Sequence, residues 1–127
     1  MLYLTIEQVL FLHARLIAET CGSHGVRDLG LLQSAIARPQ ASFEGVNLYP
    51  DLFTQAAALL DSLARNHPIV DGNKRTAIAA AALFLRSNGY QLTALNKEVI
   101  TFMMAVAQGE MSIEAMTNWL HQHSMQG

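Results

Sequence analysis

Residues 66–75 read Asn-His-Pro-Ile-Val-Asp-Gly-Asn-Lys-Arg, and residues 76–85 continue as Thr-Ala-Ile-Ala-Ala-Ala-Ala-Leu-Phe-Leu. The second ten residues are apolar on nearly every side of a helix, which is typical of a helix buried in the core. The first ten contain a base, a carboxylate, amides, two cations and a glycine. A polar cluster that leads directly into a buried helix predicts an active site at the N-terminus of that helix. We expect this helix, which ends at Asn88-Gly89, to be the central one of the fold.

Five other segments have apolar residues at helical spacing. Thr5, with Gln8 three residues later, is expected to cap the first of them, and Asp28 the second. The third segment spans Asp51 to Arg65. Asn96 and Ser112 are expected to cap the last two. The chain 1–127 is therefore predicted to be one all-α domain, a compact bundle of about six helices around a buried central helix.

The segment from Gln40 to Pro50 breaks the helical pattern, because it combines aromatic residues with Gly45 and Asn47. We expect a loop, or a short hairpin with its turn near Gly45. The aromatic residues Phe43 and Tyr49 have two open interpretations, recognition of a ligand or packing against the edge of the core.

Two further segments lie outside the expected helices. Tyr90 to Leu95 is expected to be a short connection, and the tail from His121 is expected to be frayed.

Composition restricts the partners. The net charge is -2, and so we expect no direct nucleic-acid binding and no attraction to an anionic membrane. The longest apolar run, Ala77 to Leu85, is far shorter than the ~20 residues that span a bilayer. The single cysteine, Cys21, excludes an internal disulfide and a four-cysteine zinc site, and we interpret it as structural. These features favour a cytoplasmic protein.

The spacing of residues 66–75 predicts an anion site. Pro68 prevents the preceding helix from continuing, and Gly72 lets backbone amides approach a ligand. The first amides of the next helix have no partners inside it, and the helix dipole adds partial positive charge there. Asn73 could donate to a phosphate or fix the turn, whereas Lys74 and Arg75 supply two cations.

Two further side chains complete the predicted chemistry. His67 is suited to accept a proton at neutral pH, and Asp71 is a hard oxygen ligand suited to Mg²⁺ that phosphate oxygens also hold. Each feature alone is more often structural than functional, but together they favour phosphoryl or nucleotidyl transfer.

Residues 67–75, His-Pro-Ile-Val-Asp-Gly-Asn-Lys-Arg, resemble the Fic/Doc motif His-x-Phe-x-Asp/Glu-Gly-Asn-Gly/Lys-Arg. Other matching residues, at 27–39, 49–52 and 88–90, are similar to the Doc ("death on curing") branch, the toxin of a toxin–antitoxin pair. The resemblance implies a Fic-type helical fold. It also implies that His67 deprotonates a hydroxyl of a target protein and that Asp71 binds Mg²⁺ with the phosphates of ATP.

The resemblance assigns the remaining residues of the site as well. It places Gly72, Asn73, Lys74 and Arg75 in the phosphate site, and it implies a target-aligning flap at Phe43, Glu44 and Gly45.

Three departures from the motif of AMP-transferring members bear on the reaction. Ile69 replaces phenylalanine, an apolar exchange of small expected effect. Lys74 replaces glycine, and Ile78 stands where a second arginine binds phosphates. A lysine would crowd the anion site and hold a phosphate as a point charge. The terminal phosphate of ATP is then expected to face His67, which favours a kinase over an AMP transferase.

The Doc branch implies elongation factor Tu as the target and arrested translation as the consequence. No self-inhibitory Ser/Thr-x-x-x-Glu-Gly/Asn pattern is found, so a cognate antitoxin is expected in trans. Two alternatives remain open: an AMP transferase of Fic type, and a non-catalytic phosphate-binding or DNA-associated module.

Overall fold

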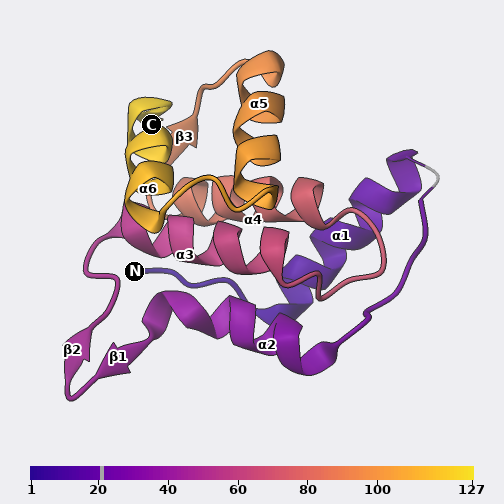
Figure 1. Ribbon diagram of the computed structural model, residues 1–127, viewed down its shortest axis with the longest axis horizontal. Helices are drawn as coiled ribbons and strands as arrows, with labels where there is room; N and C mark the ends of the chain where they lie inside the picture. The colour runs from indigo at the N-terminus through magenta and orange to yellow at the C-terminus, as the bar shows by residue number, and fades with distance from the viewer. Residues whose placement is uncertain (21) are drawn as a thin grey trace.

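The computed structural model describes residues 1–20 and 22–127; Cys21, which we expected to be structural, lies outside the described residues. The chain is predominantly helical, as predicted (Figure 1). The α-helices of the described residues are α1 (Ile6–Thr20), α2 (Leu29–Ala37), α3 (Leu52–Arg65), α4 (Asn73–Ser87), α5 (Asn96–Ala107) and α6 (Ile113–Gln122). A short 3-10 turn, η1 (Arg38–Gln40), continues α2. The strands form two antiparallel pairs, β1 (Ser42–Phe43) with β2 (Val46–Asn47), and β3 (Tyr90–Leu92) with β4 (Ser124–Gln126).

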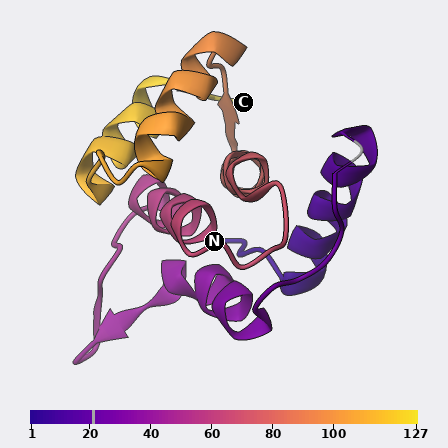
Figure 2. The same ribbon diagram turned by 45° about the vertical axis from the view of Figure 1, so that its right-hand side comes forward.

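The helices α3 and α4 form the antiparallel centre of the molecule, with α5 and α6 on one side and α1 and α2 on the other (Figure 2). The expected central position of α4 is confirmed, but α3 shares the centre and is more deeply buried. Residues 55–64 of α3 are all buried, whereas burial in α4 recurs at helical spacing and Ile78, Ala79, Ala82 and Leu83 are half-buried. The apolar sequence of α4 did not reveal that one of its faces remains partly open. None of the described helices is long and apolar enough to cross a membrane.

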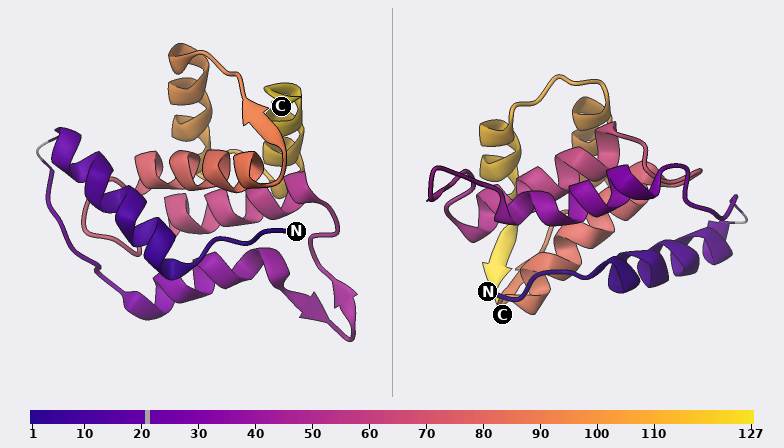
Figure 3. Two further views of the ribbon diagram at one scale, coloured as in Figure 1. Left: turned by 180° about the vertical axis from the view of Figure 1, so that it is seen from behind. Right: turned by 90° about the horizontal axis from the view of Figure 1, so that it is seen from below.

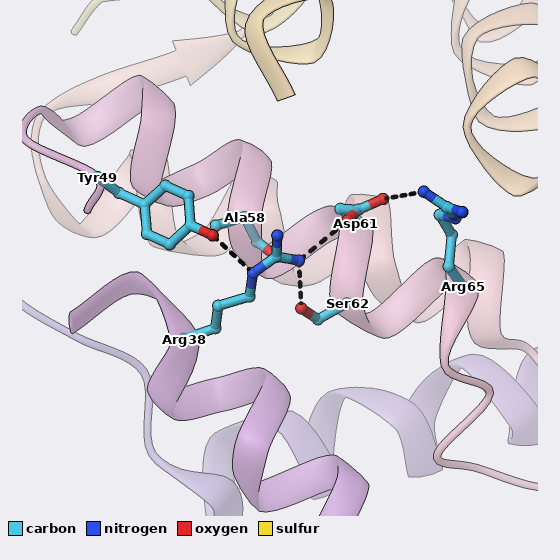
Figure 4. Close-up of polar contacts among 6 residues, drawn as sticks. All are labelled: Arg38, Tyr49, Ala58, Asp61, Ser62 and Arg65. Carbon is cyan, nitrogen blue, oxygen red and sulfur yellow. Dashed lines mark hydrogen bonds and ion pairs between the residues drawn. The ribbon is translucent and has the colours of Figure 1, made fainter. Parts of the chain in front are cut away.

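The buried polar residues Asp61 and Ser62 of α3 belong to a hydrogen-bonded network with Arg38 (Figure 4). The Arg38 Nη1 atom donates to Asp61 Oδ2 at 2.9 Å and to Ser62 Oγ at 2.8 Å. Arg38 Nε donates to the Tyr49 hydroxyl at 2.9 Å, and Arg65 pairs with the second oxygen of Asp61 at 3.5 Å. Because Arg38 precedes the β1–β2 hairpin and Tyr49 follows it, the network fixes both ends of the hairpin to α3.

The expected hairpin is present. Its turn residues, Glu44 and Gly45, have φ of 51° and 79°, as a two-residue turn with left-handed backbone requires. Phe43 is 68% exposed, so it does not pack against the core, whereas Tyr49 is half-buried on Arg38. The two aromatic residues therefore differ, because Phe43 is exposed whereas the ring of Tyr49 packs on Arg38.

Most predicted helix caps are confirmed. Thr5 and Gln8 bond reciprocally at 2.8 and 3.2 Å, and the Asp28 and Ser112 side chains each accept an amide at 3.0 Å. The predicted cap at Asn96 is wrong, because Asn96 is the first helical residue. The Leu95 amide before it donates instead to Glu98 Oε1 at 2.9 Å.

The C-terminal segment is ordered, so the prediction of a frayed tail is wrong, and residues 90–92 of the expected 90–95 connection form strand β3. Strand β4, which follows α6 (Figure 3), pairs with β3. Tyr90 lies opposite Gln126. The Trp119 ring stacks between Phe102 at 3.8 Å and His123 at 4.1 Å. Strand pairing and ring stacking are long-range contacts, and local sequence pattern does not show them.

The buried network gives the first prediction. Asp61→Ala should lower the free energy of unfolding by about 3 kcal/mol, because Arg38 would keep its charge without the carboxylate. Asp61→Asn should cost less, since its amide oxygen can still accept from Arg38. Urea titration measures both, and the surface control Glu110→Ala should stay within about 0.5 kcal/mol of the parent. An effect of Asp61→Ala as small as that of the control would contradict a stabilising network.

Candidate active site

The loop between α3 and α4 borders a cleft of about 510 Å³ at one end of the central helix pair. The side of the cleft formed by this loop and by the first turn of α4 carries His67, Asp71, Gly72, Asn73, Lys74 and Arg75. Thr20, Gly22 and Ala107 complete its lining together with Val70. The structure thus brings together all the residues predicted for catalysis, metal binding and phosphate binding.

Volume alone does not identify this cleft as the site. A depression of about 540 Å³ lies at the other end of α4, beside Arg86 and Tyr90. Among its described lining residues there is one cation and no acidic side chain. The 510 Å³ cleft is the better candidate because it combines an imidazole, a carboxylate and two cations.

The N-terminus of α4 has the geometry of an anion site. Gly72 precedes the helix with φ of 78°, and no side chain caps it. The first intrahelical bond runs from the Thr76 amide to the Gly72 carbonyl at 2.9 Å, so the amides of residues 73–75 have no partner within the helix. Lys74 and Arg75 are exposed and form no ion pair within residues 1–20 and 22–127. Free amides and free cations therefore converge on one end of the cleft.

Asn73 fixes the turn rather than offering its side chain to a ligand. Its Nδ2 donates to the Ile69 carbonyl at 3.0 Å, and its Oδ1 accepts from the Ile69 amide at 3.2 Å. Both polar atoms of the side chain are therefore engaged. Of the two roles that the sequence allowed, the geometry favours the structural one, and the backbone amide of Asn73 remains for an anion.

His67 is exposed on the cleft and has an unusual backbone conformation. Its φ of 49° lies in the left-handed region, which non-glycine residues seldom adopt and which costs about 1–3 kcal/mol. Arg27 contacts this turn; the sequence indicated it only as one of the residues that match the Doc branch and gave it no role in the site. The Nε of Arg27 donates to the His67 carbonyl at 2.6 Å, and its Nη2 donates to the Asn66 carbonyl at 2.9 Å.

Asp71 links the loop to the end of α1. Its Oδ1 accepts from the Gly72 amide at 2.8 Å, and its Oδ2 accepts from the Ser23 amide at 3.2 Å. Gly22 lies against this carboxylate so closely that a Cβ atom at position 22 would be 2.5 Å from Oδ2. The position of the carboxylate thus depends on the absence of a side chain at residue 22.

A residue that sequence reasoning missed is His13, which lies buried beneath the loop. Its Nε2 donates to the Asp71 carbonyl at 3.2 Å. Burial, followed by the charge of His24, lowers the pKa of His13, and the charge of Asp71 opposes this shift. A histidine on the apolar face of a helix gave no sequence signal for this contact.

The predicted flap does not reach the cleft. Phe43, Glu44 and Gly45 form the hairpin before α3, whereas the His67 loop follows the other end of that helix (Figure 1). Because α3 has 14 residues, its ends are about 21 Å apart. These three residues are absent from the described lining of the cleft, and their role in target alignment stays a prediction.

Comparisons with known proteins all give matches to one family. A profile of the Fic/DOC family matches residues 3–85. The protein "Toxin Doc" of Mycolicibacterium smegmatis (strain ATCC 700084 / mc(2)155) is 64% identical over 73 residues, which cover 58% of this chain and 56% of that relative. "Protein kinase doc" of Escherichia phage P1 is 34% identical over 122 residues, which cover 94% of each chain. The match thus spans little more than half the length of the first relative and nearly all of the second.

The buried histidine gives the second prediction. The pKa of His13 is lower in the folded than in the unfolded protein, so the unfolded state binds more protons between the two values. The contribution of neutral His13 to stability is therefore complete above the ordinary value of about 6.5 and is lost as the pH falls through the lowered pKa. His13→Gln, which keeps a donor without titrating, should flatten the fall of Tm on acidification. The exposed control His121→Gln should not, and equal acid sensitivity of parent and His13→Gln would contradict this role.

Proposed function

The chain belongs to the Fic/DOC family, and we propose that it is the toxin of a toxin–antitoxin pair and transfers the γ-phosphate of ATP to a hydroxyl of a target protein. The observation that carries the proposal is the juxtaposition of His67 with the free amides and cations at the start of α4. The names of the two relatives, a toxin and a protein kinase, support the same assignment.

In the proposed transfer, one set of groups binds the phosphates and another group takes the proton of the target hydroxyl. The amides of the first turn of α4, with Lys74 and Arg75, hold the phosphates and offset their charge. The target hydroxyl oxygen forms a bond to the γ-phosphorus, while the bond from that phosphorus to the β–γ bridging oxygen breaks and ADP leaves. The imidazole of His67 takes the hydroxyl proton and later releases it to water.

Asp71 is proposed to hold Mg²⁺ together with the phosphates. Its carboxylate is exposed, and each oxygen accepts one amide, which leaves further lone pairs free. The described residues contain no cluster of three metal-binding side chains, so phosphate oxygens and water would supply the other ligands, as is usual for Mg²⁺. When bound, the ion would neutralise charge on the phosphate oxygens.

Transfer of the γ-phosphate is preferred over AMP transfer because of Lys74. The Lys74 side chain lines the cleft at the position where AMP-transferring members of the family carry glycine. Ile78 stands where those members carry a second arginine for the phosphates, so it supplies no cation. The target, by the same resemblance, is elongation factor Tu, whose modification would arrest translation in the cytoplasm. A cognate antitoxin would act in trans by covering the site.

A γ-label experiment gives the third prediction. With elongation factor Tu as substrate, label from the γ position of ATP should enter the target, whereas label from the α position should not. His67→Ala should reduce the rate by about 100-fold or more, because His67 is the one imidazole among the described residues that line the cleft. His121→Ala, an exposed histidine on α6, is the matched control and should keep the parent rate.

The possible outcomes separate the proposed function from its rivals. Label from the α position in the target would identify an AMP transferase. Full labelling by His67→Ala would remove the base from the mechanism. ATP binding without any transfer, by parent and variant alike, would indicate a phosphate-binding module.

The contact between Gly22 and Asp71 gives the fourth prediction. Gly22→Ala should displace the carboxylate, because the added methyl group would lie 2.5 Å from Oδ2. The Mg²⁺ concentration needed for half-maximal ATP binding, measured calorimetrically, should then rise by about tenfold. Ser23→Ala is the control, because it keeps the backbone amide that donates to Asp71. An unchanged Mg²⁺ requirement in Gly22→Ala would argue against Asp71 as the metal ligand.

A further inference from the structure

We infer that Arg27 is a positioning residue for His67, and that its guanidinium sets the direction in which the imidazole enters the cleft. The inference rests on the proposed function for its consequence in catalysis. Its structural basis is independent, since it lies in the two hydrogen bonds from one guanidinium to the carbonyls of Asn66 and His67.

The two bonded carbonyls lie on either side of the His67 Cα atom. The Asn66 carbonyl belongs to the peptide plane before that atom, and the His67 carbonyl belongs to the plane after it. The relative orientation of these two planes is the φ and ψ of His67. A rigid planar donor that bonds both oxygens, at 2.9 and 2.6 Å, therefore fixes both angles and with them the direction of the Cα–Cβ bond.

The conformation that Arg27 fixes is one that the local sequence does not favour. His67 is not a glycine, yet its φ is 49°. The following Pro68 restricts it further, since a residue before proline prefers extended backbone. A left-handed histidine before proline persists only where its surroundings hold it.

Other contacts hold the loop after His67 but not the turn itself. The Pro68 carbonyl accepts from the Arg27 and Asp28 amides at 2.9 and 3.0 Å, and the Val70 amide donates to the Gly25 carbonyl at 3.1 Å. Within the described residues, the guanidinium of Arg27 is the one donor that bonds the Asn66 and His67 carbonyls. The Arg27 side chain thus fixes the backbone at Asn66 and His67, whereas the backbone of residues 25–28 fixes Pro68 and Val70.

The charge at the end of α3, and the lack of a competing ion pair for Arg27 among the described residues, also favour this role. Asn66 follows the last residue of α3, where the helix dipole leaves partial negative charge, so a cation is favourable there. The neighbouring carboxylate of Asp28 caps α2 by accepting from the Leu31 amide, and no ion pair holds Arg27 elsewhere in the described part of the chain. Arg27 is therefore free to bond the turn.

The test separates positioning from general stabilisation. Arg27→Ala should lower kcat for phosphate transfer by about 100-fold, as expected when a reacting group is displaced by about 1 Å. Calorimetric binding of Mg²⁺ with a non-hydrolysable ATP analogue should be unchanged, because the α4 amides and cations remain in place. In protein labelled with ¹³C at histidine Cε1, the His67 resonance should shift while that of His121 stays. Arg86→Ala, at the far end of α4, is the matched control and should change none of these quantities.

Arg27→Lys keeps the inference testable even where the alanine variant folds poorly. An ammonium group is a point charge and cannot hold two peptide planes at a fixed angle, so kcat should stay well below that of the parent. Full recovery of kcat by Arg27→Lys would overturn the positioning role. A parent-like kcat in Arg27→Ala would overturn it too, as would an unmoved His67 resonance. Failure of the proposed function is a separate result. If the parent had no transferase activity, the difference in the His67 resonance between parent and Arg27→Ala would still show whether Arg27 positions His67.

Discussion

The packing of α3 against α4 is the constraint on which the rest of the structure depends. Both helices contribute fully buried alanines, among them Ala56 and Ala57 on α3 and Ala80 and Ala81 on α4. Small side chains let two helix backbones approach closely. Because the helices run antiparallel and only residues 66–72 connect them, the chain must reverse within a short loop. The left-handed conformations of His67 and Gly72 lie in this reversal.

The antiparallel arrangement also places opposite helix ends side by side. The last carbonyls of α3 carry partial negative charge, and the first amides of α4 carry partial positive charge. The protein offsets the negative end itself, through the guanidinium of Arg27 on the Asn66 and His67 carbonyls. It leaves the positive end without a side-chain cap and adds Lys74 and Arg75 to it. At this end of the helix pair, the negative terminus of α3 is therefore neutralised internally, and the positive terminus of α4 is open to an anion.

The sequence predicted what local chemistry determines and missed what depends on contacts between distant segments. Most helix caps, with the exception of Asn96, and the hairpin turn at Gly45 follow from short-range hydrogen bonding and backbone preference, and they were predicted correctly. The greater burial of α3 was missed because Asp61 looks like a surface residue until Arg38 pairs with it. The roles of His13 and Arg27 were missed for the same reason, since their partners lie 58 and 39–40 residues away.

Departures from local rules gather at the cleft, and this distribution is itself evidence for function. Helices α1, α2, α3 and α6 each begin with a side chain that accepts an amide of the first turn, whereas no side chain caps α4 within the described residues. Two cations occupy its first turn, where the helix dipole disfavours them. His67 adopts a conformation that costs free energy. Folding alone explains none of these features, whereas a site that binds phosphates beside a positioned base would account for all three.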